Sequence, residues 1–279
     1  MKKVIVLLLA AVLLLSVIGC KKAENKKLTV AMSPDFAPME FVDTSKSGQE
    51  QYVGFDVTLA NFLAKELGME LEIKPMSFDP CMTAVQLGSV DMAISGFSWK
   101  PDRAENFLLS DYYIAGDNET QQSVITVKAK ENTCKTQADF SGWKVGAQAS
   151  SLQEQLVKDE LIPAGAELVV YKSIDDAVLA LQTGKIDALA VAHGNGEAII
   201  ANNPDLAFTG FDFDVDPKYE NNVILLNKSN TEMLEKVNKV LAKAMAAGVY
   251  DGWYEDAKAL AGIPTAADVS YDDDGKPVS

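Results

Sequence analysis

One short unit occurs twice in this chain, and it constrains the fold more than any other feature of the sequence. A helical run is followed by a glycine, one polar residue, Val or Ile, an aspartate and an apolar stretch. The first copy covers residues 82–94 and the second covers residues 177–191. The glycine ends a helix, and the aspartate (Asp91 or Asp187) turns the chain into a buried strand. The repeat therefore predicts two similar α/β halves.

The segments around the two copies alternate strand and helix in the same way. Residues 28–32 and 143–147 have the composition of strands. Residues 54–68 predict a helix, because leucines recur every four residues and Gly68 provides a natural stop. A long helix is expected over residues 231–247. Its apolar face is predicted to contain four side chains: Leu234, Val237, Leu241 and Met245.

This order predicts an α/β fold of two lobes, each a mostly parallel sheet flanked by helices. Two extended crossings would join the lobes and leave a cleft at the carboxyl ends of the strands. The expected first lobe combines residues 28–116 with residues 221–264, and the second lobe is residues 117–220. Residues 265–279 are acidic and lack apolar periodicity, so we expect a surface tail.

The N-terminus has the pattern of an export signal. Two lysines precede residues 4–18, an uncharged apolar run of 15 residues, which is shorter than the roughly 20 that span a membrane. Residues 17–20, Val-Ile-Gly-Cys, are similar to the bacterial lipobox, in which the cysteine is acylated; an ordinary signal is the alternative. We expect a signal peptide at residues 1–19 and a tether at residues 20–27. A lipid on Cys20 would then anchor an exported protein to a cell membrane, in a periplasm or on a Gram-positive surface.

Charge and cysteine usage exclude several classes of function. The formal net charge of −15 argues against nucleic acid and against a polybasic membrane contact. Cys81 and Cys134 lack metal-ligand spacing and fall in different predicted lobes, so two free thiols are expected, with a disulfide as the alternative. His193 is the only histidine, which excludes a multi-histidine metal site. No metal or cofactor is expected.

Four separated motifs carry a resemblance to a known family. They are residues 33–41 (SPDFAPMEF), 53–57 (VGFDV), 76–79 (MSFD) and 94–103 (ISGFSWKPDR). With them, residues 28 to about 258 resemble the extracellular solute-binding proteins of ABC transporters, in the polar amino-acid-binding family. The resemblance implies a type II-like periplasmic-binding-protein fold, whose lobes close over a small solute.

The resemblance also implies ligand contacts in the first lobe. Phe36 and Phe78 would be aromatic walls, and Arg103 would clamp a ligand carboxylate with its rigid fork of donors. Core packing of the phenylalanines, and a surface ion pair of Arg103 with Asp102 or Glu105, are the alternatives. Further polar contacts are expected from three small residues: Ser95, Gly96 and Ser98.

In the second lobe, residues 145–152 match the second carboxylate contact of the family. This loop ends at a predicted helix N-terminus, where free N–H groups attract anions. Gln148 and the hydroxyl of Ser151 are expected to contact the ligand, and Leu152 would contribute its backbone only.

One position departs from the family pattern. Many members place an acid five residues after the aspartate of the repeated unit, where it holds the α-ammonium of the ligand, and Ala192 stands there. Either another acid reaches the ammonium, or the ligand lacks a free α-ammonium. The adjacent His193 is then either a ligand contact or a structural residue. Four acids are candidates for the ammonium: Asp35, Glu197, Asp212 and Asp214.

Three functions follow from the resemblance. The first is a monomeric binding protein that delivers an amino acid or small carboxylate to an ABC transporter permease. The second is a dehydratase-like enzyme with His193 as acid or base, although the sequence has no nucleophile–base pair, metal set or phosphate loop. The third is a receptor that presents its ligand to a separate signalling protein.

Overall fold

The computed structural model describes residues 26–113, 121–219, 221–265, 270–271 and 277–278. The predicted signal peptide, Cys20 and most of the tether lie outside these ranges, as do the residues 114–120 of the first crossing. Within the described ranges, no helix is both long enough and apolar enough to cross a membrane.

The first sheet has five strands in the order β5–β1–β6–β13–β7. Strand β1 (Lys27–Met32) pairs in parallel with β5 (Glu70–Pro75) and with β6 (Met92–Ala93). Strand β13 (Leu225–Leu226) is antiparallel to both β6 and β7 (Leu108–Leu109). Four of the five strands therefore run in one direction, and the chain returns to this sheet after it has built the second one.

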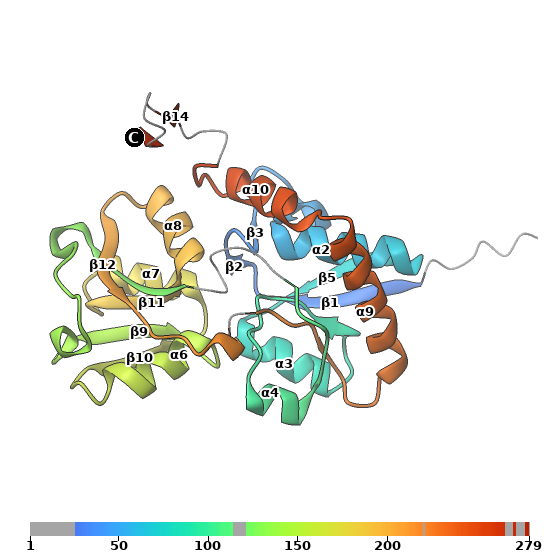
Figure 1. Cartoon of the computed structure of the whole chain (residues 1–279), viewed down its shortest axis with the longest axis horizontal. Coiled ribbons are helices and arrows are strands. Elements are labelled where there is room, and N and C mark those ends of the chain that lie inside the picture. Colours follow the sequence, from blue (N-terminus) through green and yellow to red (C-terminus); the bar gives the residue numbers. More distant parts are fainter. Residues whose placement is uncertain (1–25, 114–120, 220, 266–269, 272–276, 279) are drawn as a thin grey trace, which may run out of the picture.

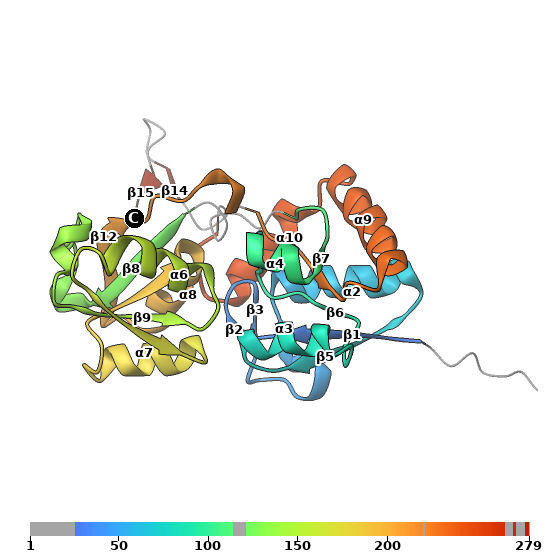
Figure 2. The ribbon, with the colours of Figure 1, turned by 90° about the horizontal axis from the view of Figure 1, so that it is seen from below.

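The second sheet repeats this arrangement in the order β10–β9–β11–β8–β12. Strand β9 (Lys144–Gln148) pairs in parallel with β10 (Glu167–Tyr171) and with β11 (Ala188–Ala192). Strand β8 (Gln122–Val127) is antiparallel to β11 and to β12 (Leu206–Asp212). The two α/β halves expected from the sequence are confirmed, and they lie side by side in Figures 1 and 2.

Helices cover both faces of the first sheet, and we call this sheet together with its helices lobe one. On one face, α2 (Phe55–Leu67), α9 (Thr231–Ala246) and α10 (Tyr250–Leu260) share one buried apolar cluster with β1 and β6. On the other face, α3 (Phe78–Gln86) packs against β6 and β13 in a second cluster, beside α4 (Pro101–Asn106). The ring of Phe55 is the centre of the first cluster, where it contacts four aromatic rings: Tyr113, Tyr250, Trp253 and Tyr254.

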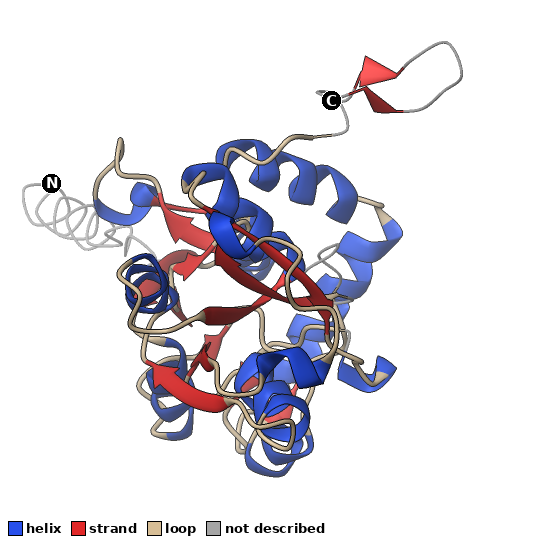
Figure 3. Cartoon of the chain, turned by 90° about the vertical axis from the view of Figure 1, so that its left-hand side faces the viewer, coloured by secondary structure: helices blue, strands red, loops and turns tan. Residues whose placement is uncertain are grey.

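Lobe two, built on the second sheet, is layered in the same way (Figure 3). One face is covered by α6 (Leu152–Leu156), which continues with wider turns over Val157–Leu161. The other face is covered by α7 (Ile174–Gln182) and α8 (His193–Asn202). Helices α6, α7 and α8 each follow a parallel strand of the sheet, so their N-termini lie at the edge that faces lobe one.

The remaining described elements are short. Three strands form a small sheet in lobe one: β2 (Asp35–Phe36), β3 (Glu40–Val42) and β4 (Tyr52–Val53). Single helical turns occupy four segments: Gly48–Gln51, Lys128–Lys130, Gln137–Phe140 and Pro217–Tyr219. Of the predicted tail, most lies outside the described residues; β14 (Ser270–Tyr271) and β15 (Pro277–Val278) pair away from both lobes (Figure 1).

The aspartate of the repeated unit forms the same kind of hydrogen bond in each lobe. Asp91 accepts a hydrogen bond from the backbone N–H of Thr29 at 2.7 Å, and Asp187 accepts one from the N–H of Lys144 at 3.0 Å. Thr29 is on β1 and Lys144 is on β9, the strands that pair with β6 and β11. Each carboxylate thus joins the turn before one parallel strand to the strand beside it.

The predicted face of the long helix requires one correction. Helix α9 buries Val237 and Leu241 as expected, but also Val240 and Ala244, whereas Met245 is 53% exposed. At about 100° per residue, Met245 lies at the edge of the face that these four side chains define.

Both remaining cysteines are free thiols, as predicted. Cys81 on α3 and Cys134 in lobe two are buried in different apolar clusters.

Candidate functional site between the lobes

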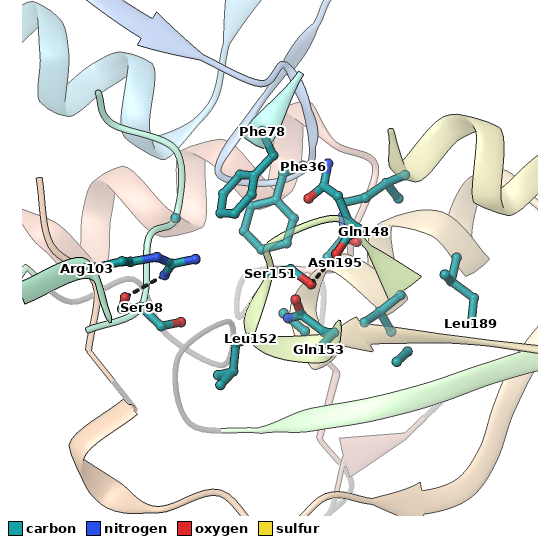
Figure 4. A pocket seen from close by; sticks show the side chains of 15 residues that line it. Phe36, Phe78, Ser98, Arg103, Gln148, Ser151, Leu152, Gln153, Leu189 and Asn195 are labelled. Atoms are coloured by element: carbon teal, nitrogen blue, oxygen red, sulfur yellow. Dashed lines mark hydrogen bonds between the residues drawn. The ribbon is translucent and has the colours of Figure 1, made fainter. Parts of the chain in front are cut away.

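A cavity lies between the lobes, and Figure 4 shows the side chains that surround it. Its volume is about 30 Å³, room for no more than about two water molecules, so a solute can enter only if the lobes separate. Lobe one contributes Phe36, Phe78, Gly96, Ser98 and Arg103. Lobe two contributes ten residues: Gln148, Ser151, Leu152, Gln153, Ile174, Leu189, Ala190, Val191, Ala192 and Asn195.

Arg103, on α4, is the only arginine of the chain. Its side chain is 1% exposed, and its guanidinium lies over the rings of Phe78 and Phe97, 5.5 and 5.3 Å from their centroids. Nη1 donates to the carbonyl of Ser98 at 2.6 Å, and Nη2 donates to the carbonyl of Ser150, in lobe two, at 2.9 Å. Nε is buried, and no described residue forms a hydrogen bond with it.

No acid of the described ranges forms an ion pair with this cation. Among the described residues, Asp102 pairs with Lys100 rather than with Arg103, and Glu105 forms no ion pair with it, so the surface ion pair considered from the sequence is absent. Burial lowers the pKa of Arg103 to about 10, which still leaves the guanidinium charged at neutral pH. A buried charge without a counter-ion is costly, and an anion in the same cavity would compensate it.

The two phenylalanines form a wall beside the guanidinium. Phe78 is buried and stacks on Phe97, with ring centroids 4.6 Å apart, so it is both a core residue and a lining residue. Phe36 lies against Gly96, where φ is +54° and where a Cβ would come within 2.6 Å of the phenylalanine ring. Glycine at position 96 therefore allows the ring to approach the backbone of the loop.

Ser95 does not reach the cavity, which corrects the predicted ligand contact. It is fully buried beneath the loop, where its hydroxyl donates to Glu40 and accepts from the N–H of Ser33. Asp56 accepts from the N–H of Gly96 at 2.8 Å. Ser95 thus supports the loop that carries Gly96 and Ser98.

Two carboxyl groups meet below this loop. Glu40 and Asp56 are both fully buried, and Asp56 also accepts from the hydroxyl of Tyr113. Desolvation raises the pKa of Asp56 to about 7, and desolvation together with the charge of Asp56 raises the pKa of Glu40 well above its ordinary value. Glu40 Oε2 and Asp56 Oδ1 have no hydrogen-bond partner within the described ranges, and one proton held between the two groups would satisfy both oxygens.

Helix N-termini dominate the wall formed by lobe two. Ser151 caps α6 by accepting from the N–H of Glu154, and its own hydroxyl donates to the carbonyl of Gln148 at 2.7 Å. Ile174 and Ala192 stand at the starts of α7 and α8. The positive ends of three helix dipoles thus add to the charge of Arg103, and the arrangement favours an anion.

The two lobes are joined across the cleft by several hydrogen bonds. Asp35 of lobe one accepts from the backbone N–H of Ile174 at 2.8 Å and from Nε2 of Gln148 at 3.3 Å. Asn195 donates from Nδ2 to the carbonyl of Ala37 at 2.8 Å. These contacts describe a closed arrangement of the lobes.

His193 does not line the cavity, contrary to the ligand contact considered from the sequence. It begins α8 and turns toward strands β8 and β12, where its ring stacks on Phe208 with the ring centroids 4.5 Å apart and Nδ1 lies 2.9 Å from Ser123 Oγ. Ser123 donates its own proton to Asp212, so it can only accept from Nδ1–H of the histidine. The hydroxyl of Ser123 thus forms two hydrogen bonds within this cluster.

None of the acids considered for an α-ammonium lines the cavity. Asp35 accepts a hydrogen bond from the N–H of Ile174 in lobe two, and Asp212 accepts one from the hydroxyl of Ser123. Glu197 and Asp214 are likewise absent from the lining, whereas Ala192 is part of it. The described residues hold no group of three or more His, Cys, Asp or Glu side chains that could bind a metal ion.

Sequence reasoning missed several lining residues, most of them apolar. The polar ones are Gln153 and Asn195, in the first turns of α6 and α8. Only their positions in the sequence could have predicted them as lining residues. Each lies in the first turn of a helix that begins at the carboxyl edge of the sheet.

Comparison with known proteins decides the family. A family model described as bacterial extracellular solute-binding proteins, family 3, matches residues 28–256. The chain belongs to this family. Family 3 proteins are solute-binding proteins of transporters, not enzymes, so the dehydratase alternative gains no support.

Two curated relatives illustrate the similarity of this family 3 chain to proteins with assigned solutes. The arginine-binding extracellular protein of Bacillus subtilis is 29% identical over 86% of this chain and 92% of its own length. The histidine-binding periplasmic protein of Salmonella typhimurium is 26% identical over 81% of this chain and 85% of its own length.

Solved structures confirm the two-lobed fold of family 3. A substrate-binding protein from Streptococcus pneumoniae, bound to L-arginine, is 34% identical, covers 88% of this chain and 100% of its own, and has a TM-score of 0.78. An ancestral arginine-binding protein bound to arginine is 32% identical over 82% of this chain and 97% of its own, with a TM-score of 0.73.

Proposed function

We propose that this chain is the solute-binding component of an ABC importer, and that it binds an amino acid or a related small carboxylate between its lobes. The observation that carries the proposal is Arg103, a buried cation at the lobe interface that no acid of the described part of the chain pairs with. The fork of a guanidinium matches a carboxylate with two parallel hydrogen bonds. The arginine and histidine bound by the named relatives belong to this class of solute.

The proposed mechanism is lobe closure. Lobe one, residues 28–116 with 221–264, would take up the solute through Arg103, Ser98 and the aromatic wall. Lobe two, residues 117–220, would then close over it and add Gln148 and the helix starts at Ser151 and Leu152. The hydrogen bonds of Asp35 to lobe two support such a closed form.

The proposal extends to the setting of the protein. The lipobox-like residues 17–20 support acylation of Cys20, which would hold a monomeric receptor on the outer face of a cell membrane beside its permease.

A thermal-shift screen over amino acids and small carboxylates, followed by calorimetry, tests the binding function. We expect at least one solute to raise the melting temperature of the wild type and to leave Arg103→Ala unchanged. Lys100→Ala is the matched control, because Lys100 is a neighbouring buried cation that does not line the cavity. If no solute stabilises the wild type, the proposed function is wrong.

A further inference from the structure

Asn195 stands out among the lining residues, because it is buried and only half of its amide is used. The side chain is 1% exposed. Nδ2 donates to the carbonyl of Ala37, whereas Oδ1 has no hydrogen-bond partner among the residues that the structure describes. Buried amide oxygens in native proteins almost always accept a hydrogen bond, so an unpaired one in a cavity calls for a ligand donor.

The orientation of the amide is fixed by its surroundings. The partner on lobe one is a carbonyl oxygen, which can only accept. Turning the amide over would place Oδ1 against that carbonyl and lose the only hydrogen bond of the side chain. The atom of the Asn195 amide left without a partner is therefore the acceptor Oδ1, and a group that forms a hydrogen bond with it has to be a donor.

Among the described residues, no group that lines the cavity donates to Asn195 Oδ1. The two glutamines that line the cavity from lobe two donate to other acceptors. Gln153 donates to Gln122, and Gln148 donates to Asp35. No lysine and no acid is among the lining residues of this cavity. The positively charged Arg103 is bound to backbone carbonyls by both of its terminal nitrogens.

We propose that Asn195 is a specificity-determining residue, whose Oδ1 accepts a hydrogen bond from a nitrogen donor of the bound solute. The solute class is a carboxylate that also presents an N–H group toward α8. The proposal rests on the proposed function, since it requires that a solute occupies this cavity. It adds a contact that ties recognition to closure, because the same amide reaches lobe one through Ala37.

The test uses calorimetry with L-arginine, or with the amino acid that gives the largest thermal shift. Each nitrogen is removed in turn: 5-guanidinopentanoate lacks the α-amino group of arginine, and norleucine lacks its guanidinium. In the wild type, we expect loss of the contacted nitrogen to weaken binding about ten-fold or more. In Asn195→Leu, which has nearly the same shape, the same change should cost less than about three-fold.

A purely structural role gives a different result. If Asn195 acts only through Ala37, Asn195→Leu weakens arginine and both analogues by the same factor, and the proposal is overturned. Asn202→Leu is the matched control, because Asn202 also lies on α8 and donates to a backbone carbonyl, that of Ala261, without lining the cavity. Asn195→Ala repeats the comparison if the leucine variant does not fold. Failure of the wild type to bind any solute would instead contradict the proposed function.

Discussion

Arg103 and Ser150 connect the two lobes directly: Nη2 of the arginine donates to the backbone carbonyl of the serine at 2.9 Å. The serine stands just before α6, and its hydroxyl donates back to Asp79 of lobe one. The cation proposed to hold the solute is thus also part of the contact between the lobes.

Arg103→Lys should weaken solute binding at least ten-fold in calorimetry. An ammonium is a point donor and cannot hold Ser98, Ser150 and a carboxylate in one plane, and a hydrogen bond to a charged group is worth about 1.5–3 kcal/mol. Unchanged affinity in the lysine variant would mean that charge alone suffices.

Gly96→Ala should lower both stability and affinity. A Cβ there meets the ring of Phe36 at 2.6 Å, and the positive φ of +54° adds about 1 kcal/mol of strain or more. Gly88→Ala is the matched control: its φ is +66°, but a Cβ there meets nothing within 4 Å. We expect urea unfolding to show a loss in both variants, and solute binding to fall only at position 96. Equal binding by both variants would contradict the close contact with Phe36.

Asp56→Asn should flatten the dependence of stability on pH. Burial raises the pKa of Asp56 from 3.8 to about 7, so the folded state holds a proton that the unfolded state has lost between these values. Folding stability therefore falls as pH rises from about 4 to about 7, by about 1.4 kcal/mol per pH unit for this group. Urea unfolding at pH 5 and pH 7.5 would measure the slope. The same slope in wild type and variant would show that Asp56 does not titrate in this range.

Asp91→Ala and Asp187→Ala should each destabilise the fold, by about 1.5–3 kcal/mol, because each leaves a strand N–H without its charged acceptor. Asp102→Ala, at a position where the side chain is 64% exposed, should stay within about 0.5 kcal/mol of the wild type. Chemical denaturation is the measurement. A neutral result at either repeated aspartate would mean that water replaces the carboxylate.

Ala192→Asp should improve the binding of solutes with a free α-ammonium about ten-fold, if the missing acid is what restricts them. Ala192 is buried in the cavity wall, and no lining residue of the cavity is acidic. A carboxylate there would pair with the ammonium in a site of low dielectric constant. Calorimetry with an amino acid and its desamino analogue would detect the change. Weaker binding of both solutes would indicate that another group already holds the ammonium.

The sequence by itself determined the elements and their order. The repeated unit predicted two α/β halves, and Gly54 and Gly68 do bracket α2 as the leucine spacing indicated. Such features depend on residues a few positions apart, whose conformations are set by local sterics and by burial of one face. Eight of the ten predicted ligand contacts also line the cavity, because strand ends and helix starts locate them.

Only the tertiary structure decided which side chains face the cavity and which polar atoms stay unpaired. His193 and Asn195 are two residues apart, yet His193 turns to Phe208 while Asn195 turns to Ala37 in the other lobe. Ser95 and Ser98 differ in the same way, since Ser95 points down to Glu40. Rotation by about 100° per residue separates His193 from Asn195 in direction on α8. The partners come from other segments of the chain, which lie in the same lobe for His193 and Ser95 and in the other lobe for Asn195. Packing of those distant segments, which no local pattern encodes, therefore fixed the site.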